Sequence, residues 1–129
     1  MSNKKALIEQ HSAQLSRPVM DLAIHGSTLL YDPRLSTLLH LVEYTKSVQA
    51  ACSLMQMSYS TAWHMLNRVE DELGFPLVMR NRGGASGNGT VLTEKGKRMM
   101  DAYDQFAERM KKETDLLYSS FFSDPMNPS

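Results

Sequence analysis

The sequence predicts a mainly α-helical fold with one small β hairpin and a long C-terminal helix. Three observations lead to this prediction. Apolar residues recur at helical spacing in three successive segments between residues 32 and 74. Two short apolar runs then flank a glycine-rich stretch, which is the pattern of a hairpin with a polar tip. A last segment, residues 93–118, repeats apolar residues in steps of four and three.

Length and composition indicate one ordinary globular domain. The chain has 129 residues, 42% of them hydrophobic and 22% charged, and 14 basic and 14 acidic residues give a formal net charge of zero. These values are usual for a soluble domain. No apolar run reaches the roughly 18–20 residues that span a bilayer, so we expect no membrane segment. Cys52 is the one cysteine, and a chain without an internal disulfide suits the cytoplasm.

A polar segment and a strand precede the first predicted helix. Residues 1–18 are mostly polar and are expected to form a flexible N-terminal segment. Residues 19–32 roughly alternate between apolar and polar side chains, which is typical of a strand. The sequence His25-Gly26-Ser27 is expected to kink this strand.

Three helices are predicted to follow in close succession. Asp32 is a suitable N-cap and Pro33 suits the first position of a helix over 32–46. Ser47 and Ser58 are N-caps of the next two helices, over 47–57 and 58–74. Gly74 suits the last helix end, because glycine readily adopts the left-handed conformation found there. The residues expected to form the core are Leu35, Leu38, Leu39, Leu41, Val42, Val48, Ala51, either Leu54 or Met55, Ala62, Trp63, Leu66, Val69 and Leu73.

Two β-like runs come next, at residues 75–82 and 90–92. The sequence GGASGNG lies between them. Glycine has no Cβ, so its backbone can approach another molecule closely. We therefore predict an antiparallel hairpin whose glycine-rich tip, residues 83–90, adapts to a surface.

The last predicted helix begins after Thr93, a suitable N-cap. A helix of about 25 residues is about 37 Å long at 1.5 Å per residue, which exceeds what so small a domain can cover. We therefore predict that residues 93–118 form a dimerisation helix between two identical chains, followed by a tail at 119–129. The predicted interface residues are Met99, Tyr103, Phe106, Met110 and Leu117.

The order of these elements is that of a DNA-binding helix-turn-helix with an added hairpin, a winged helix-turn-helix. In such proteins the second helix of the pair, here about residues 58–73, lies in the major groove, and the wing contacts the backbone. Hydroxyls at a helix N-terminus suit phosphate, whereas Asn favours adenine and Arg favours guanine. The residues of this helix predicted to contact DNA are Ser58, Ser60, Thr61, His64, Asn67 and Arg68.

Positive charge gathers around the predicted wing although the whole chain is neutral. Residues 77–100 include five basic residues and one acidic residue, whereas residues 101–129 include three basic and six acidic residues. A polyanion responds to the local potential rather than to the total charge. The run at residues 70–72, Glu-Asp-Glu, is expected to be a solvated face that points away from DNA. The residues predicted to contact the DNA backbone at the wing are Arg80, Arg82, Lys95 and Lys97.

Several short motifs between residues 58 and 106 carry a resemblance to a known family. They are Ser58-Tyr59 with Ala62-Trp63, Leu77-Val78 leading to Arg80, the Gly83-Gly84 wing, and Leu92-Thr93 followed by Gly96. In these motifs the chain resembles the N-terminal winged helix of ModE-type, molybdate-responsive regulators, within the LysR-like group. With the preceding helices the resemblance covers about residues 20–118. It implies a dimeric bacterial transcription regulator that binds double-stranded DNA.

Two questions stay open at this level. Full-length members of that family continue into a separate molybdate-binding domain, and the sequence after residue 118 is expected to be too short for one. No small-molecule effector is therefore assigned to this chain; an effector bound at the dimer interface is a further, weaker hypothesis, for which the sequence shows no recognisable pocket. An alternative hypothesis is an interaction protein that pairs, through residues 93–118, with a full-length regulator and modulates it.

Other function classes receive little support. Cys52, Met55 and Met57 are soft ligands close in sequence, but methionine is more often an adaptable core residue, and we predict neither a metal nor another cofactor. Cys52 is expected to be a small buried residue, because no basic residue adjoins it. The glycine-rich stretch lacks the Lys-Ser/Thr of a nucleotide-binding loop, and no nucleophile and base stand at catalytic spacing. We therefore expect the chain not to be an enzyme.

Overall fold

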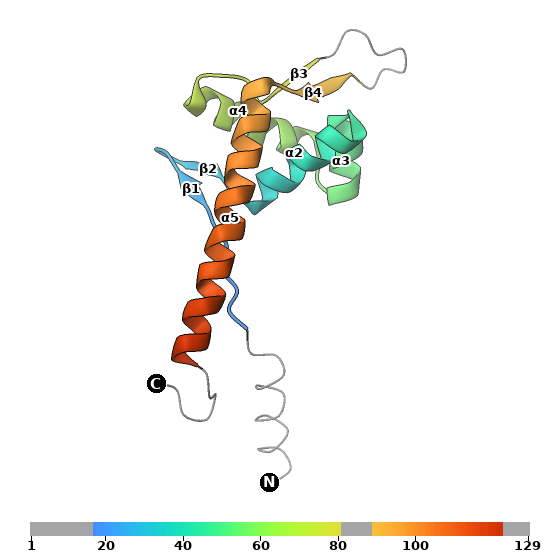
Figure 1. Ribbon diagram of the computed structural model, residues 1–129. Coiled ribbons are helices and arrows are strands. Elements are labelled where there is room, and N and C mark those ends of the chain that lie inside the picture. The colour runs from blue at the N-terminus through green and yellow to red at the C-terminus, as the bar shows by residue number, and fades with distance from the viewer. Residues whose placement is uncertain (1–16, 81–88, 123–129) are drawn as a thin grey trace. The chain divides into compact units, whose positions relative to one another are not determined.

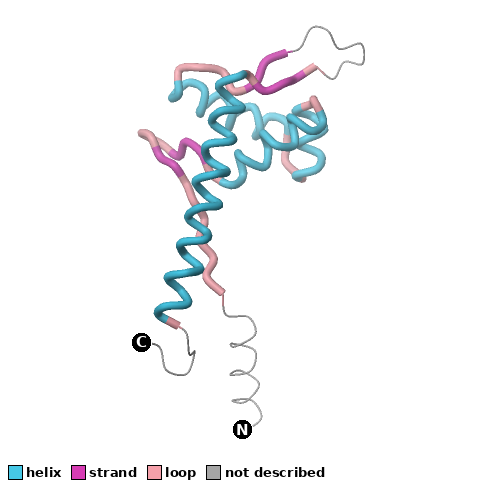
Figure 2. The backbone as a smooth tube through the Cα atoms, viewed as in Figure 1, coloured by secondary structure: helices cyan, strands magenta, loops and turns pink. Residues whose placement is uncertain are grey.

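The computed structural model describes residues 17–80 and 89–122. Over these residues the fold is mainly helical, with four helices and two small hairpins (Figure 1; Figure 2), so the predicted fold class is confirmed. The predicted N-terminal segment up to residue 16, the wing tip at 81–88 and the tail after residue 122 lie outside the described residues. In chain order the elements are β1 (Ile24–His25), β2 (Leu29–Tyr31), α2 (Pro33–Thr45), α3 (Val48–Met55), α4 (Tyr59–Leu73), β3 (Val78–Arg80), β4 (Thr90–Leu92) and α5 (Glu94–Phe121).

The predicted N-caps of α2, α3 and α4 are confirmed. At each cap a side-chain oxygen accepts a hydrogen bond from the backbone amide three residues later, at 2.9 Å for Asp32, 3.0 Å for Ser47 and 3.1 Å for Ser58. Each bond satisfies an amide that the first helical turn leaves without a backbone partner. A cap of this kind contributes typically about 1 kcal/mol to helix stability.

The sequence marks the C-terminal end of α4 with a glycine, but it does not mark the ends of α2 and α3 in this way. α4 ends at Gly74 with φ of 80°, as predicted. α2 and α3 end at Lys46 and Gln56, whose φ values of 61° and 55° are also left-handed. This conformation is uncommon outside glycine, and it directs the Lys46 amide to the Val42 carbonyl at 2.7 Å. These two helix ends therefore have no glycine to mark them in the sequence.

α3 and α4 form the helix-turn-helix pair, and three residues connect them. α2 contacts both helices. Leu73, expected in the core, is only half-buried. Leu41, Met55 and Trp63 are also half-buried, and Leu54 is 61% exposed. The remaining predicted core residues are buried, and they are joined by Tyr31, Leu77, Val78, Leu92, Met100 and Tyr103.

The segment predicted as one kinked strand over residues 19–32 is a hairpin. β1 and β2 pair antiparallel, with Ile24 opposite Tyr31. The Gly26 amide donates a hydrogen bond to the Thr28 carbonyl at 2.9 Å and closes the turn where only a kink was expected. The single-strand prediction is therefore wrong, because alternation of side chains is the same whether a strand continues or reverses.

The predicted hairpin with the glycine-rich tip is confirmed in its paired part. β3 and β4 are antiparallel, with Val78 opposite Leu92 and Arg80 opposite Thr90. Val78 and Leu92 are buried, whereas Met79, the next residue of β3, is 52% exposed. One face of this hairpin is thus part of the core, and the other faces solvent.

α5 begins after Thr93, whose hydroxyl accepts a hydrogen bond from the Gly96 amide at 2.9 Å. The helix continues for 28 residues. The chain divides into two compact units, one of Asp21–Phe106 and one that includes residues 17–20 and 107–122. In the part of the chain that the structure describes, no helix is both long enough and apolar enough to cross a membrane.

Candidate nucleic-acid interface

The first half of α4 presents a polar face to solvent. Its buried residues, Ala62, Leu66 and Val69, recur in steps of four and three, so one side of the helix packs inward and the other is open. Together with Ser58, the residues of the open side are those that the sequence predicts to contact DNA. They are Ser60, Thr61, His64, Asn67 and Arg68, and all five are exposed.

Ser58 differs from these five because it is the N-cap of α4 and its hydroxyl binds the backbone of the first turn. It accepts from the Thr61 amide at 3.1 Å and donates to Thr61 Oγ1 at 2.6 Å. Ser60 Oγ lies 3.4 Å from Ser58 Oγ. Three hydroxyls therefore gather at the N-terminus of α4, where the partial positive charge of a helix favours an anion.

The cations predicted at the wing are exposed where the structure describes them. Arg80 is exposed at the end of β3, whereas Arg82 lies outside the described residues. Lys95 and Lys97 are exposed in the first turn of α5. Lys95 Nζ lies 5.2 Å from the centre of the Phe75 ring, which is a cation–π contact. The aromatic ring thus restricts one of the cations beside the base of the wing.

Glu70 connects α4 to the base of the wing. One carboxylate oxygen accepts hydrogen bonds from the Leu77 amide at 2.6 Å and from the Val78 amide at 3.4 Å. An ionised acceptor makes such hydrogen bonds stronger than neutral ones. The expectation that Glu70 belongs to a solvated acidic run is therefore wrong. No local pattern could have shown this, because the partner amides lie seven and eight residues further along the chain.

Thr93 and Gly96 contact the same stretch of backbone from the start of α5. The Thr93 hydroxyl donates to the Pro76 carbonyl at 2.6 Å, and its amide donates to the Leu77 carbonyl at 2.9 Å. Gly96 lies so close to the Leu77 carbonyl that a Cβ at this position would collide with the backbone. Glycine is thus required at position 96 by packing.

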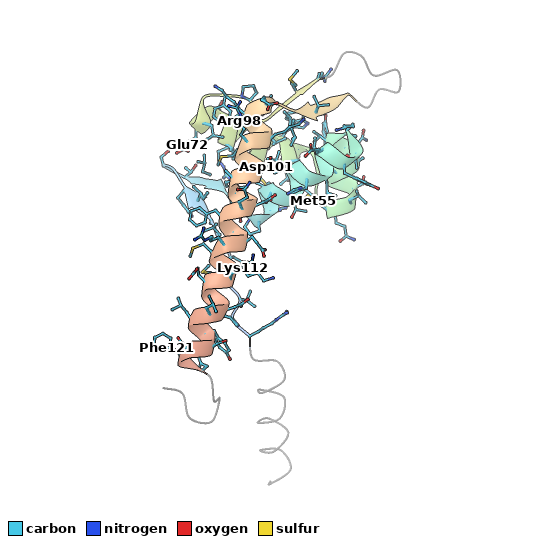
Figure 3. The ribbon with its side chains drawn as sticks, in the orientation of Figure 1. Met55, Glu72, Arg98, Asp101, Lys112 and Phe121 are labelled. Carbon is cyan, nitrogen blue, oxygen red and sulfur yellow. The ribbon has the colours of Figure 1, made fainter. Side chains whose placement is uncertain are left out.

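Glu72 makes comparable contacts with the other hairpin. Its carboxylate accepts hydrogen bonds from the Ser27 amide, from the Ser27 hydroxyl at 2.9 Å and from the Thr28 hydroxyl at 3.1 Å. These bonds, those from Ser27 above all, lower the pKa of the Glu72 carboxyl below its usual value. Figure 3 shows Glu72 beside the turn of β1–β2. Glu72 also differs, therefore, from the merely solvated acid that was expected.

Asp104 connects α5 to α2 within the larger unit. It accepts a hydrogen bond from the Ser36 hydroxyl at 2.9 Å, and its other carboxylate oxygen contacts His40 Nε2. Ser36 is buried, so this bond satisfies a polar group that has little access to water. The first part of α5 is thereby part of the domain that carries α4.

Tyr103 belongs to the core of its own chain. It is 5% exposed, its ring centre lies 4.6 Å from that of Tyr31, and its hydroxyl donates to the Leu22 carbonyl at 2.7 Å. Burial raises the pKa of this hydroxyl. These contacts contradict its predicted place in a dimer interface, because the spacing of a heptad seam is also the spacing of a face packed within one chain. The other predicted interface residues are half-buried or exposed, namely Met99, Phe106, Met110 and Leu117.

Cys52 is a buried structural residue, as predicted. It is 3% exposed, and burial raises the pKa of its thiol. A raised pKa leaves little of the reactive thiolate. Among residues 17–80 and 89–122, no three side chains of His, Cys, Asp or Glu are grouped so that they could bind a metal ion.

A helix-turn-helix followed by a hairpin, with an open polar face on the second helix, is the arrangement of a DNA-binding regulatory domain. Residues 34–97 match the sequence profile of the family described as "Bacterial regulatory helix-turn-helix protein, lysR family". This match covers the chain from α2 to the first turn of α5 and includes both sides of the wing.

Known regulators are similar to the chain in sequence and in fold. It is 35% identical over 89 residues to the transcriptional regulator ModE of Yersinia pestis, and 34% identical over 89 residues to the DNA-binding transcriptional dual regulator ModE of Escherichia coli K12. Each match covers 69% of this chain and 34% of the relative, so the matched part spans about a third of these relatives. CbnR, a LysR family transcriptional regulator, has a similar fold over 68% of this chain and 29% of its own, with a TM-score of 0.53 at 19% identity.

Residues 34–97 are therefore the DNA-binding helix-turn-helix domain of a transcription regulator. The domain belongs to the LysR family, with ModE proteins among its relatives, and this confirms the resemblance seen in the sequence motifs. The description of the family as regulatory agrees with the expectation that the chain is not an enzyme.

Proposed function

We propose that this chain is a cytoplasmic, dimeric transcription regulator that recognises a specific sequence in double-stranded DNA. In this proposal α4 lies in the major groove, and the wing of β3 and β4 lies against the phosphate backbone. The observation that supports it most is the open polar face of α4, on which Ser60, His64 and Asn67 are exposed. They follow one another in steps of four and three, which is the row of a helix that can face a groove.

The proposed contacts divide into those that read bases and those that bind phosphates. Asn67 and Arg68 carry side chains that can make two hydrogen bonds with adenine and guanine, and each such pair discriminates by about 1–3 kcal/mol. Ser60 and Thr61 are close to the helix N-terminus and suit phosphate. The proposed phosphate contacts of the wing are Arg80, Arg82, Lys95 and Lys97.

Selection from a randomised duplex library, followed by binding measurements over a range of salt, tests this assignment. Asn67→Ala is expected to change the preferred sequence, because it removes a base contact. Arg80→Ala is expected to weaken binding to all sequences alike and to reduce the slope of log K against log salt by about 1. Gln105→Ala, an exposed amide on α5, is the control for Asn67. A chain that binds no duplex at about 50 mM salt would not be such a regulator.

Exposed apolar residues on α5 support the proposed dimer. Phe106 and Leu117 are 52% and 58% exposed, and exposed apolar surface, where it is contiguous, marks sites of protein–protein contact. Sedimentation should show a wild-type dimer, and Leu117→Lys should shift it towards monomer because a charge would enter an apolar contact. Lys111→Glu, at an exposed position of the same helix, should leave the dimer intact. A wild-type chain that stays monomeric at high concentration would exclude this interface.

The same exposed residues support a second candidate function, in which the chain pairs through residues 93–118 with a full-length regulator and modulates it. Leu116, 66% exposed, adds to the apolar surface available for such pairing. Native mass spectrometry of the chain mixed with a full-length relative separates the candidates. Mixed dimers would favour the modulator function. A dimer of this chain that binds DNA without the full-length relative would favour the regulator function.

A further inference from the structure

Two acidic residues near the end of α4 are attached to two different hairpins. Glu70 accepts hydrogen bonds from Leu77, just before β3, and from Val78 at its start, and Glu72 accepts them from the β1–β2 turn. With about 3.6 residues per helical turn, positions 70 and 72 lie about 200° apart around the helix axis. Glu70 therefore lies on one side of the open face of α4, and Glu72 lies on the other. The carboxylate relevant to the wing is that of Glu70.

The base of the wing is connected to several elements of the domain. Glu70 binds the amides of Leu77 and Val78, and the Thr93 amide binds the Leu77 carbonyl. On the other strand, Thr90 lies opposite Arg80, further from the base, and its amide donates to the Lys46 carbonyl at 3.1 Å. The Thr93 and Thr90 bonds join the wing to α5 and to the end of α2. The Glu70 bonds join it to α4, the helix proposed to read the DNA.

A small change at Leu77 becomes a large change at Arg80. Strand residues rise by about 3.3 Å each, so Arg80, three residues further on, lies about 10 Å away. A rotation of about 10° at the base of the strand would move Arg80 by about 2 Å. Hydrogen bonds to phosphate oxygens tolerate only about 0.5 Å of variation in length. The attachment at Leu77, together with the bond from Thr90 to Lys46, thus affects whether Arg80 and α4 meet the same duplex together.

We infer that Glu70 is a positioning residue for DNA recognition, which fixes β3 and Arg80 relative to α4 through the Leu77 and Val78 amides. The inference rests on the proposed function. A carboxylate near a polyanion would ordinarily oppose binding, and here it accepts hydrogen bonds from two amides of the wing instead. Glu70 acts on DNA only through the strand that it orients.

The test compares Glu70→Ala, Glu70→Gln and Asp71→Ala on a duplex selected by the wild-type chain from a randomised library. Asp71→Ala removes the same charge from the neighbouring exposed residue. Hydroxyl-radical footprinting reports backbone contacts, and protection of guanine N7 from methylation reports major-groove contacts. Hydrogen exchange of the Leu77 and Val78 amides, measured without DNA, reports the attachment itself.

For Glu70→Ala we expect faster hydrogen exchange at the Leu77 and Val78 amides. We also expect weaker hydroxyl-radical protection of the DNA backbone that the wing contacts. The magnitude of the slope of log K against log salt should decrease by about 1 for each phosphate that the wing no longer neutralises. Guanine protection at saturating protein should persist. Glu70→Gln should restore both readouts, because its amide oxygen can still accept from Leu77, and Asp71→Ala should bind as tightly as wild type or more tightly.

If Glu70→Ala lost the protection of the DNA backbone and that of guanine N7 together, in proportion to the fraction of the variant that is unfolded, Glu70 would have a structural role only. That result would overturn the inference. So would a Glu70→Ala footprint identical to that of wild type. If the wild-type chain selects no duplex, the proposed function fails and the inference fails with it; the exchange data then identify Glu70 as a fold contact alone.

Discussion

The hairpins β1–β2 and β3–β4 are both small antiparallel pairs, and each receives a glutamate from the second half of α4. Their surroundings differ. β3 and β4 contribute the buried residues Val78 and Leu92, and Leu77 just before β3 is fully buried. In β1–β2 the turn that Glu72 contacts is exposed. The same type of contact therefore connects one hairpin at a buried base and the other at a solvated tip.

This difference indicates what each hairpin needs from the rest of the domain. A hydrogen bond to a buried amide cannot be replaced by water, so its loss costs about 1–3 kcal/mol. An exposed turn exchanges its bonds with solvent and loses little. The wing, which is proposed to meet DNA, is thus held at its base by contacts that are costly to break.

The largest effect is expected from shortening the residue at the base of the wing. Leu77→Ala removes a fully buried side chain and should lower the free energy of unfolding by about 2–5 kcal/mol. Leu30→Ala, at a half-buried position of β2, should cost less. Urea denaturation measures both. Equal losses would mean that the two hairpins are equally embedded in the core.

A second comparison uses two glycines, Gly96 of α5, which contacts the base of the wing, and Gly26 in the β1–β2 turn. Gly96→Ala places a Cβ against the Leu77 carbonyl, which is backbone and cannot move aside, so we expect a loss of about 1–3 kcal/mol. Gly26→Ala meets only the Glu72 carboxylate, the far end of a flexible side chain. Its effect on thermal unfolding should be clearly smaller. A larger effect at Gly26 would reverse the ranking of the two contacts.

The smallest effect is expected from acid pH at the β1–β2 turn. The pKa of Glu72 is lowered in the folded chain, so its hydrogen bonds stabilise the fold fully above the ordinary glutamate range, and this contribution is lost as the pH falls through the lowered pKa. The stability difference between wild type and Glu72→Gln should thus be constant near neutral pH and shrink below about pH 4.3. Asp71→Asn is the control, and a difference that grows in acid would contradict the assignment.

Much of the fold could be predicted because its signals are local. An N-cap such as Ser47 bonds an amide three residues away, and Gly74 ends α4 by its own conformation. Lys46 and Gln56 end α2 and α3 in the same conformation, but neither residue type signals it. The hairpin at residues 24–31 was missed for a related reason, since alternation does not show where a strand turns back.

The candidate site divides in the same way. The exposed polar face of α4 follows from which residues of the helix are apolar, so the sequence by itself determined it. Only the tertiary structure decided that Glu70 and Glu72 bind two hairpins and that Tyr103 packs against Tyr31. The physical reason is distance along the chain. Periodicity reports which side of an element avoids water, whereas the partner that covers that side is chosen when remote segments pack together.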